Sequence, residues 1–143
     1  MKVEEIIEAV VGEKASIGGI KDVVWVAAGG SHGGFYPGQF FIDSEAKVLR
    51  SKNMTSNEFV AMPPAFVNES TLVVACSMRG TPETIEAARL AKKLGASTIA
   101  LYVDESELTA ISDYKIHYES VAIDSSDFSK TNSAFALKIA MVL

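Results

Sequence analysis

Short apolar runs rich in β-branched residues alternate along the chain with segments whose apolar residues recur at helical spacing. The runs predict strands at residues 23–28, 48–51, 71–76, 98–103 and 114–118. The helical spacing predicts helices at residues 2–13, 33–44, 57–62, 82–94 and 130–143, with a further turn of helix at 106–111. A strand such as Val23–Ala28, apolar on both faces, must be covered on both sides. The pattern predicts a three-layer α/β/α sandwich with about five parallel strands in flavodoxin-like order.

The helix over residues 82–94 has the clearest limits. Thr81 is a good N-cap residue, Pro82 fits the first helical position, and Gly95 follows the end. Two other helices are less well defined. Gly12 is expected to end the first helix. The helix over residues 33–44 is expected to direct four apolar side chains inward, Phe35, Phe40, Phe41 and Ile42.

Composition narrows the classes of partner. The 143 residues are 48% hydrophobic, which is enough for one substantial core, so we expect a single domain over residues 1–143. A formal net charge of −5 argues against nucleic acid or an anionic membrane as the main partner. The single cysteine, Cys76, is expected to be a buried apolar residue in a reducing compartment. With no signal peptide or membrane span visible, we expect a cytoplasmic protein.

The turn Cys76–Thr84 leaves the carboxyl end of a buried strand and opens the clearest helix. It offers the hydroxyls of Ser77 and Thr81, the guanidinium of Arg79 and backbone amides at a helix N-terminus. Gly80 allows close approach of a ligand or a positive φ. These groups suit a phosphate dianion, although the same residues also make an ordinary helix start, and spacing alone does not separate the two interpretations.

The turn Gly29–Gly34 follows the first strand and contains four glycines, which suggests close approach of its backbone to another group. Gly30 and Ser31 are candidate ligand contacts. His32 is a candidate proton carrier or could open a sugar ring, but of these interpretations we favour a polar residue on an exposed turn. Glu58, in Ser56–Phe59, is a candidate base or sugar-hydroxyl ligand, or else a residue of a capped short helix.

No spacing of His, Cys, Asp or Glu indicates a metal site, and we predict neither a metal nor another cofactor. Asp104, Glu105 and the segment Asp124–Asp127 follow strands but lack such a partner pattern. His117 is expected on the solvated face of an edge strand. The turn at residues 76–84 lacks the lysine of a nucleotide P-loop, which argues against nucleotide binding.

Taken together, these residues resemble the SIS (sugar isomerase) domain family, and within it the fructosamine-6-phosphate deglycases and the isomerase lobe of glucosamine-6-phosphate synthase. The resemblance covers nearly the whole chain. The segments that match the family are Gly29–Ser31, Ser56–Phe59, Ser77–Thr84, Glu86–Ala91 with Gly95 and Ala96, and Ile99–Leu101.

The phosphate-loop pattern of that family, Ser-x-Ser-Gly-x-Thr-x-Glu-Thr, matches Thr81, Glu83 and Thr84 directly. Upstream the chain departs from it. If Ser77 is matched, the loop is one residue short and Arg79 replaces a Ser; without a gap, Cys76 takes the place of the first Ser. Of these alternatives we favour Ser77 and Thr81 as phosphate contacts, because a hydroxyl is a better donor than a thiol.

The resemblance implies a phosphorylated sugar or fructosamine as ligand, a homodimer, and proton transfer between C1 and C2 of a ring-opened sugar phosphate. Family members usually join two lobes, and this chain resembles the first lobe alone. Much of the acid/base machinery is then expected from a second lobe, so the 143-residue chain is expected to turn over little. A phosphosugar-sensing regulatory domain and a dimerisation domain without catalysis are the alternatives. The sequence leaves open which sugar is bound and whether the native chain continues beyond Leu143.

Overall fold

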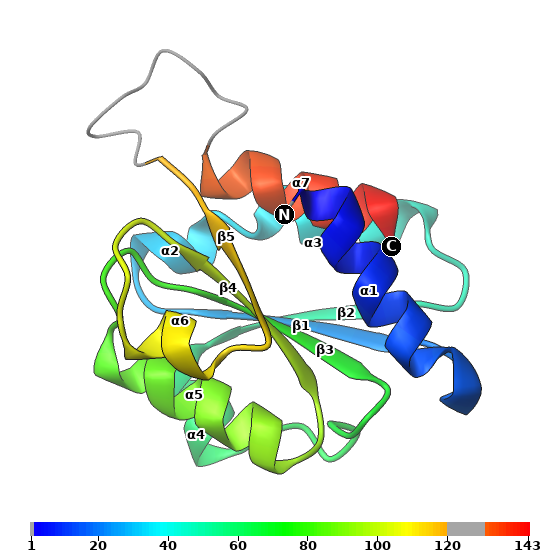
Figure 1. The fold of residues 1–143 in the computed structure, drawn as a ribbon, viewed down its shortest axis with the longest axis horizontal. Coiled ribbons are helices and arrows are strands. Elements are labelled where there is room, and N and C mark those ends of the chain that lie inside the picture. Colours follow the sequence, from blue (N-terminus) through cyan, green and yellow to red (C-terminus); the bar gives the residue numbers. More distant parts are fainter. Residues whose placement is uncertain (1, 120–130) are drawn as a thin grey trace.

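The computed structural model describes residues 2–119 and 131–143, which form one parallel sheet of five strands covered by helices on both faces (Figure 1). The strands run in the order β2-β1-β3-β4-β5, the flavodoxin-like order that the sequence predicts. Their bounds are β1 Asp22–Ala27, β2 Arg50–Thr55, β3 Thr71–Cys76, β4 Ser97–Tyr102 and β5 Tyr114–His117. Each pairing between neighbours is parallel.

Two groups of helices cover the sheet, with α1, α3 and α7 on one face and α4 and α5 on the other (Figure 1). The helices are α1 Val3–Lys14, α2 Gly30–Gly33, α3 Tyr36–Glu45, α4 Ser56–Ala61, α5 Pro82–Lys93, α6 Glu107–Ile111 and α7 Asn132–Val142, with a 3-10 turn at Ala15–Ile17. The three-layer prediction is confirmed. Within the described part of the chain, no helix is long and apolar enough to cross a membrane.

The two layers of core are built from alternate residues of the same strands, because successive strand side chains point to opposite faces. Val23 and Trp25 of β1 pack toward α1, α3 and α7, whereas Val24 and Val26 pack toward α4 and α5. All four are fully buried. This explains why residues 23–27 of β1 have no polar position to reveal an alternation.

Several predicted boundaries were wrong. Helix α1 continues through Gly12 to Lys14, and the left-handed backbone that ends this region is taken by Gly18, at φ 96°. The predicted helix over residues 33–44 corresponds to α3, which starts later, at Tyr36, and a separate short helix, α2, ends at Gly33. Phe40 is 58% exposed rather than directed inward. The strand predicted at 48–51 is β2, which starts and ends later.

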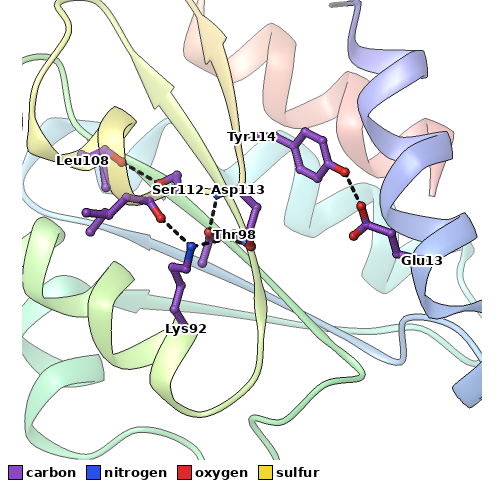
Figure 2. Close-up of polar contacts among 8 residues, drawn as sticks. Glu13, Lys92, Thr98, Leu108, Ser112, Asp113 and Tyr114 are labelled. Carbon is purple, nitrogen blue, oxygen red and sulfur yellow. Dashed lines mark hydrogen bonds and ion pairs between the residues drawn. The ribbon is translucent and has the colours of Figure 1, made fainter.

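The edge strand β5 is held by side chains from three other elements (Figure 2). The carboxylate of Asp113 accepts hydrogen bonds from the amide (2.9 Å) and hydroxyl (3.1 Å) of Thr98, the second residue of β4. Lys92 of α5 contacts the other oxygen of Asp113 at 3.1 Å. On the opposite side, Tyr114 donates its hydroxyl to Glu13 of α1 at 2.6 Å, which raises the pKa of Tyr114 to about 12.

Candidate functional site

The residues that the sequence singled out for phosphate binding or proton transfer follow strands that end at one edge of the sheet. The register places Ala27, Thr55 and Cys76 level with one another, so β1, β2 and β3 end together. In an open parallel sheet this edge is where ligands bind. The residues are Gly30, Ser31 and His32 on α2, Glu58 on α4, and Ser77, Arg79, Gly80 and Thr81 before α5.

The β3–α5 turn (Ser77–Thr81) is closed by one of its own hydroxyls. Ser77 Oγ accepts hydrogen bonds from the amide of Gly80 at 3.0 Å and from the amide of Thr81 at 2.8 Å. The hydroxyl of Thr81 lies 2.8 Å from the same oxygen. Ser77 is only 3% exposed, whereas Thr81 is half-buried. The turn is therefore held in shape by its own hydrogen bonds.

The loop that follows β4 supports the β3–α5 turn from outside. The carbonyl oxygen of Met78 accepts hydrogen bonds from the amides of Val103 (3.2 Å) and Asp104 (2.8 Å). The side chain of Asp104 then accepts from Arg79 Nε at 3.3 Å, with both side chains well exposed to solvent. Arg79 thus has a carboxylate partner while its terminal amino groups make no other ion pair within the described residues.

Gly80 is required at its position for two independent reasons. Its φ of 80° lies in the left-handed region, which side chains with a Cβ rarely adopt. A Cβ built there would also lie 2.4 Å from Ser106 Oγ. The sequence indicated the first reason, but not the second, because Ser106 belongs to the cap of α6.

The N-terminus of α5 can attract an anion. This helix has 12 residues, Thr81 occupies the N-cap position and Pro82 the first turn, as predicted. Within residues 2–119 and 131–143, the amides of Arg79 and Glu83 have no hydrogen-bond acceptor. Unpaired amides and the helix dipole together give this end of the helix a partial positive charge. The β3–α5 turn therefore has the chemistry of an anion site.

A buried pair of hydroxyls joins the helices that follow β2 and β3. Ser56 Oγ, at the start of α4, lies 2.8 Å from Thr84 Oγ1 in α5, and both residues are fully buried. Sequence reasoning treated Ser56 as part of a helix start and did not pair it with Thr84. Thr84 could be recognised in the sequence because it fits the family's loop pattern. Its contact with Ser56, 28 positions away, can be seen only in the folded structure.

Glu58 is part of a capping box. Its carboxylate accepts the amide of Thr55 at 2.9 Å, and Thr55 Oγ1 accepts the amide of Glu58 at 3.2 Å. The hydrogen bond from Thr55 lowers the pKa of Glu58, with a smaller contribution from His32. The same carboxylate lines a groove of about 620 Å³ beside Lys52 and Met62. Glu58 can therefore cap α4 and still present its carboxylate to a ligand in this groove.

The glycine-rich turn Gly29–Gly34 contains the four-residue helix α2. Gly29 precedes it at φ 58°. The side chain of Ser31 lies outside the described residues, so its predicted ligand role stays a prediction. His32 Nε2 is enclosed and has no hydrogen-bond partner among the described residues. His32 is therefore not the fully exposed residue that one interpretation of the sequence allowed.

The other candidate residues do not assemble a further site. Within residues 2–119 and 131–143, no three His, Cys, Asp or Glu side chains are grouped to hold a metal ion. The segment Asp124–Asp127 lies outside the described residues. Cys76 is buried at the end of β3, and His117 is exposed on the edge strand β5 with its ring 5.4 Å from that of Tyr102.

Known proteins resemble this chain in both sequence and fold. Fructosamine deglycase FrlB of Bacillus subtilis strain 168 is 39% identical over 102 residues, which are 70% of this chain and 31% of that protein. A crystal structure of a candidate phosphosugar isomerase from Salmonella typhimurium LT2 has 33% identity and a TM-score of 0.88, covering 99% of this chain and 43% of the other. A second one, from Bacillus subtilis, has 32% identity and a TM-score of 0.85, covering 98% and 41%.

No protein-family model matches the chain. The chain spans less than half the length of each of the three relatives, and in the two solved structures the match includes nearly all of its own residues. The strand order, the position of the β3–α5 turn and the sequence identity to these relatives all point to the same family. The chain therefore belongs to the SIS (sugar isomerase) domain family, in which it is similar to the fructosamine deglycases.

Proposed function

We propose that this chain is the first, phosphosugar-binding lobe of a sugar-phosphate deglycase or isomerase, with a fructosamine 6-phosphate or an aldose or ketose phosphate as substrate. The β3–α5 turn carries the proposal. It combines Arg79, the Ser77–Thr81 hydroxyl pair and unpaired amides at the N-terminus of α5. The 39% identity to fructosamine deglycase FrlB supports the choice of ligand class.

The phosphate is remote from the carbons that react, and its role is to fix their position. Binding energy at the β3–α5 turn would hold C1 and C2 of the open-chain sugar near catalytic groups. His32 is the candidate proton carrier or ring-opening group, because its Nε2 is enclosed and unpaired among the described residues. Because this nitrogen is enclosed, its contact with a ligand hydroxyl would require the side chain of His32 to move.

Glu58 suits a sugar-hydroxyl contact better than the role of base. Its carboxylate already accepts the Thr55 amide, which lowers its pKa, and a carboxylate with a lowered pKa is a weak proton acceptor at neutral pH. One oxygen remains available to accept a hydrogen bond from a ligand. The base that moves the proton between C1 and C2 would then come from the rest of a longer protein, and this chain alone would turn over little.

A melting-temperature panel tests the proposal. Glucose 6-phosphate, fructose 6-phosphate and a fructosamine 6-phosphate are each added at increasing concentration, since a ligand at 100 times its Kd stabilises by about 2.7 kcal/mol. The shift is expected to disappear in the double variant Ser77→Ala, Thr81→Ala. Ser112→Ala is the matched control, because that hydroxyl bonds Leu108 at 2.7 Å just before β5, at the other end of the strands. An unchanged shift in the double variant would refute the phosphate assignment.

The same panel, combined with an assay of sugar-phosphate conversion, separates the enzyme from a sensor. If the wild-type chain and a longer protein containing it both bind sugar phosphate but neither converts it, the regulatory alternative is favoured. If no sugar phosphate shifts the melting temperature, a dimerisation domain without a ligand is favoured. Conversion by the longer protein supports the deglycase or isomerase assignment.

We also infer that the chain forms a homodimer through the face made by α3 and α7. Phe40 of α3, Val48 of the loop after α3 and Met141 of α7 are 58%, 81% and 60% exposed, and Val48 and Met141 line a groove of about 360 Å³ together with Phe41 and Leu143. Exposed apolar groups of this kind are typical of interaction surfaces. Sedimentation of the wild type should give a dimer, and Val48→Glu should shift it toward the monomer. A monomer at all concentrations would contradict the inference.

A further inference from the structure

The side chain of Asn132, the first residue of α7, lies against both turns of the candidate site. Its Nδ2 atom is 3.8 Å from Sγ of Cys76, the residue that ends β3 and immediately precedes the β3–α5 turn. Its carboxamide also lies over Gly34, the last residue of the glycine-rich turn. A Cβ built on Gly34 would be 2.9 Å or less from Nδ2, Cγ and Oδ1 of Asn132. Asn132 therefore fills the space between the two turns.

The absence of a side chain at Gly34 is explained by this contact and not by the backbone. The φ of −64° and ψ of −19° at Gly34 are ordinary helical values that any residue adopts. One helical turn further on, Gly38 of α3 meets α7 in the same way, because a Cβ there would be 2.8 Å from the carbonyl oxygen of Ala136. Helix α7 is therefore packed directly against the backbone of the glycine-rich turn and of α3.

The glycine-rich turn depends on such outside support. No side chain caps α2, and the backbone of the turn is held by hydrogen bonds from the amide of His32 to the carbonyl of Gly29 (3.1 Å) and from the amide of Phe35 to the carbonyl of His32 (3.3 Å). A thiol is only a weak hydrogen-bond acceptor, so the contact of Asn132 with Cys76 is mainly one of packing. The size of the Asn132 side chain, more than its polarity, then fixes the turn relative to β3.

A spacer of this kind matters to a ligand that spans both turns. In the proposed function, phosphate binds at the β3–α5 turn, and the reacting carbons lie toward the glycine-rich turn that carries His32. Small displacements of groups that orient a substrate reduce both binding and rate. We propose that Asn132 is a positioning residue that sets the distance between the two turns. This inference rests on the proposed function and adds α7 to the elements that build its site.

The test compares glucose 6-phosphate, which would span both turns, with inorganic phosphate, which would contact the β3–α5 turn alone. Asn132→Ala removes the spacer and should weaken binding of glucose 6-phosphate by roughly 3- to 10-fold, because the loosened turn must be ordered on binding. Binding of inorganic phosphate should stay within about 2-fold of wild type. Asn132→Leu keeps the size of the side chain without its polar atoms and should bind both probes like the wild type. Titration calorimetry gives the Kd values.

Asn68→Ala is the matched control. Oδ1 of Asn68 accepts the amide of Ser70 at 2.8 Å just before β3, at the opposite edge of the sheet from the candidate site. This substitution should lower the melting temperature and leave the Kd of both probes unchanged. If it weakened binding of glucose 6-phosphate as much as Asn132→Ala does, the effect would follow from lost stability alone, and the positioning role would be overturned.

Hydrogen exchange reports on the two turns without any ligand. Asn132→Ala should speed exchange at the amides of His32 and Phe35, which belong to the glycine-rich turn and its end. The amides of the β3–α5 turn that Ser77 Oγ accepts should remain protected. Asn132→Leu should leave both turns unchanged. Unchanged exchange at His32 and Phe35 in Asn132→Ala would show that Asn132 does not hold the glycine-rich turn.

The outcomes separate this inference from the proposed function. If the wild type does not bind glucose 6-phosphate, the proposed site is wrong, and the role of Asn132 is wrong with it. If the wild type binds and Asn132→Ala weakens neither probe, or weakens both equally, the site stands and the positioning role is overturned. If Asn132→Leu loses as much affinity as Asn132→Ala, the carboxamide contacts the ligand directly, which also contradicts a role as spacer.

Discussion

The β3–α5 turn and the glycine-rich turn after β1 leave the same edge of the sheet but satisfy their polar groups differently. In the β3–α5 turn, Ser77 takes two amides and the adjacent loop takes the carbonyl of Met78. In the glycine-rich turn, Gly29 makes no side-chain cap for α2, and His32 Nε2 has no partner among the described residues.

This difference shows which turn is preformed and which is incomplete. A buried polar atom without a hydrogen bond costs free energy, so we expect a water molecule or a ligand to complete the hydrogen bonding of His32 Nε2. The β3–α5 turn can hold its shape before a ligand arrives, whereas the environment of His32 is expected to change on binding. Four experiments test this comparison, in order of decreasing expected effect.

The largest effect is expected from Gly80→Ala. The left-handed φ and the 2.4 Å approach to Ser106 Oγ together should lower the free energy of unfolding by about 2–4 kcal/mol. Gly29→Ala is the matched variant in the other turn. Its φ is also positive, at 58° with a ψ of −134°, so the backbone strain remains, but no atom of the described residues lies within 4 Å of the added Cβ, and the expected loss is about 1–3 kcal/mol. Urea denaturation measures both, and equal losses would show that Ser106 does not brace the turn.

Thr84→Val is expected to be next in size. It leaves the buried hydroxyl of Ser56 without its partner at 2.8 Å, which should cost about 1–3 kcal/mol. Adding Ser56→Ala to that variant should recover part of the loss, because the unpaired group is then removed. The cycle of two single variants and the double variant, measured by urea denaturation, gives the coupling. Strictly additive losses would mean that the two hydroxyls do not interact.

His32→Leu should not lower the free energy of unfolding, in contrast to the substitutions above. Replacing a polar ring that has an unpaired nitrogen should leave the free energy of unfolding unchanged or raise it by up to about 1 kcal/mol. The same variant should weaken sugar-phosphate binding or abolish conversion in a longer protein. Thermal melting and calorimetry measure the two quantities. A clear loss of stability would show that His32 is already satisfied and that the two turns are alike.

The smallest effect concerns Glu58, and it depends on pH. The pKa of this carboxyl lies below its ordinary value of 4.5 in the folded chain, because Thr55 donates to it. The folded state therefore binds the proton less tightly than the unfolded state, and the stabilisation is present above pH 4.5 and lost as the pH falls through the lowered pKa. Glu58→Gln should lower the melting temperature slightly at pH 7 and not at the acid end. A difference that persists at the acid end would contradict the capping role.

Most of the fold could be predicted from local patterns in the sequence. Strands such as Thr71–Cys76 and the start of α5 at Thr81 and Pro82 are defined by their own residues. The predictions failed where helix signals were weak. Gly12 did not stop α1, since one glycine in a helix costs only about 1 kcal/mol, and the left-handed turn came at Gly18.

The candidate site could be predicted only in part. The sequence indicated which turns would meet, because the carboxyl ends of parallel strands share one edge. It did not indicate that Ser56 bonds Thr84, that Asp104 pairs with Arg79, or that Ser106 abuts Gly80. Each of these contacts joins residues 25 or more positions apart, and helical or strand periodicity carries no information on such pairs.

By itself, then, the sequence determined the layers of the sheet and the chemical groups of the β3–α5 turn, since burial and turn formation depend on neighbouring residues. The tertiary structure decided how those groups are used. The oxygen of Ser77 faces two amides of its own turn, and the carboxylate of Glu58 faces the amide of Thr55. A side chain with several possible partners bonds the one that the packed backbone places within reach, and that choice is made when the elements come together.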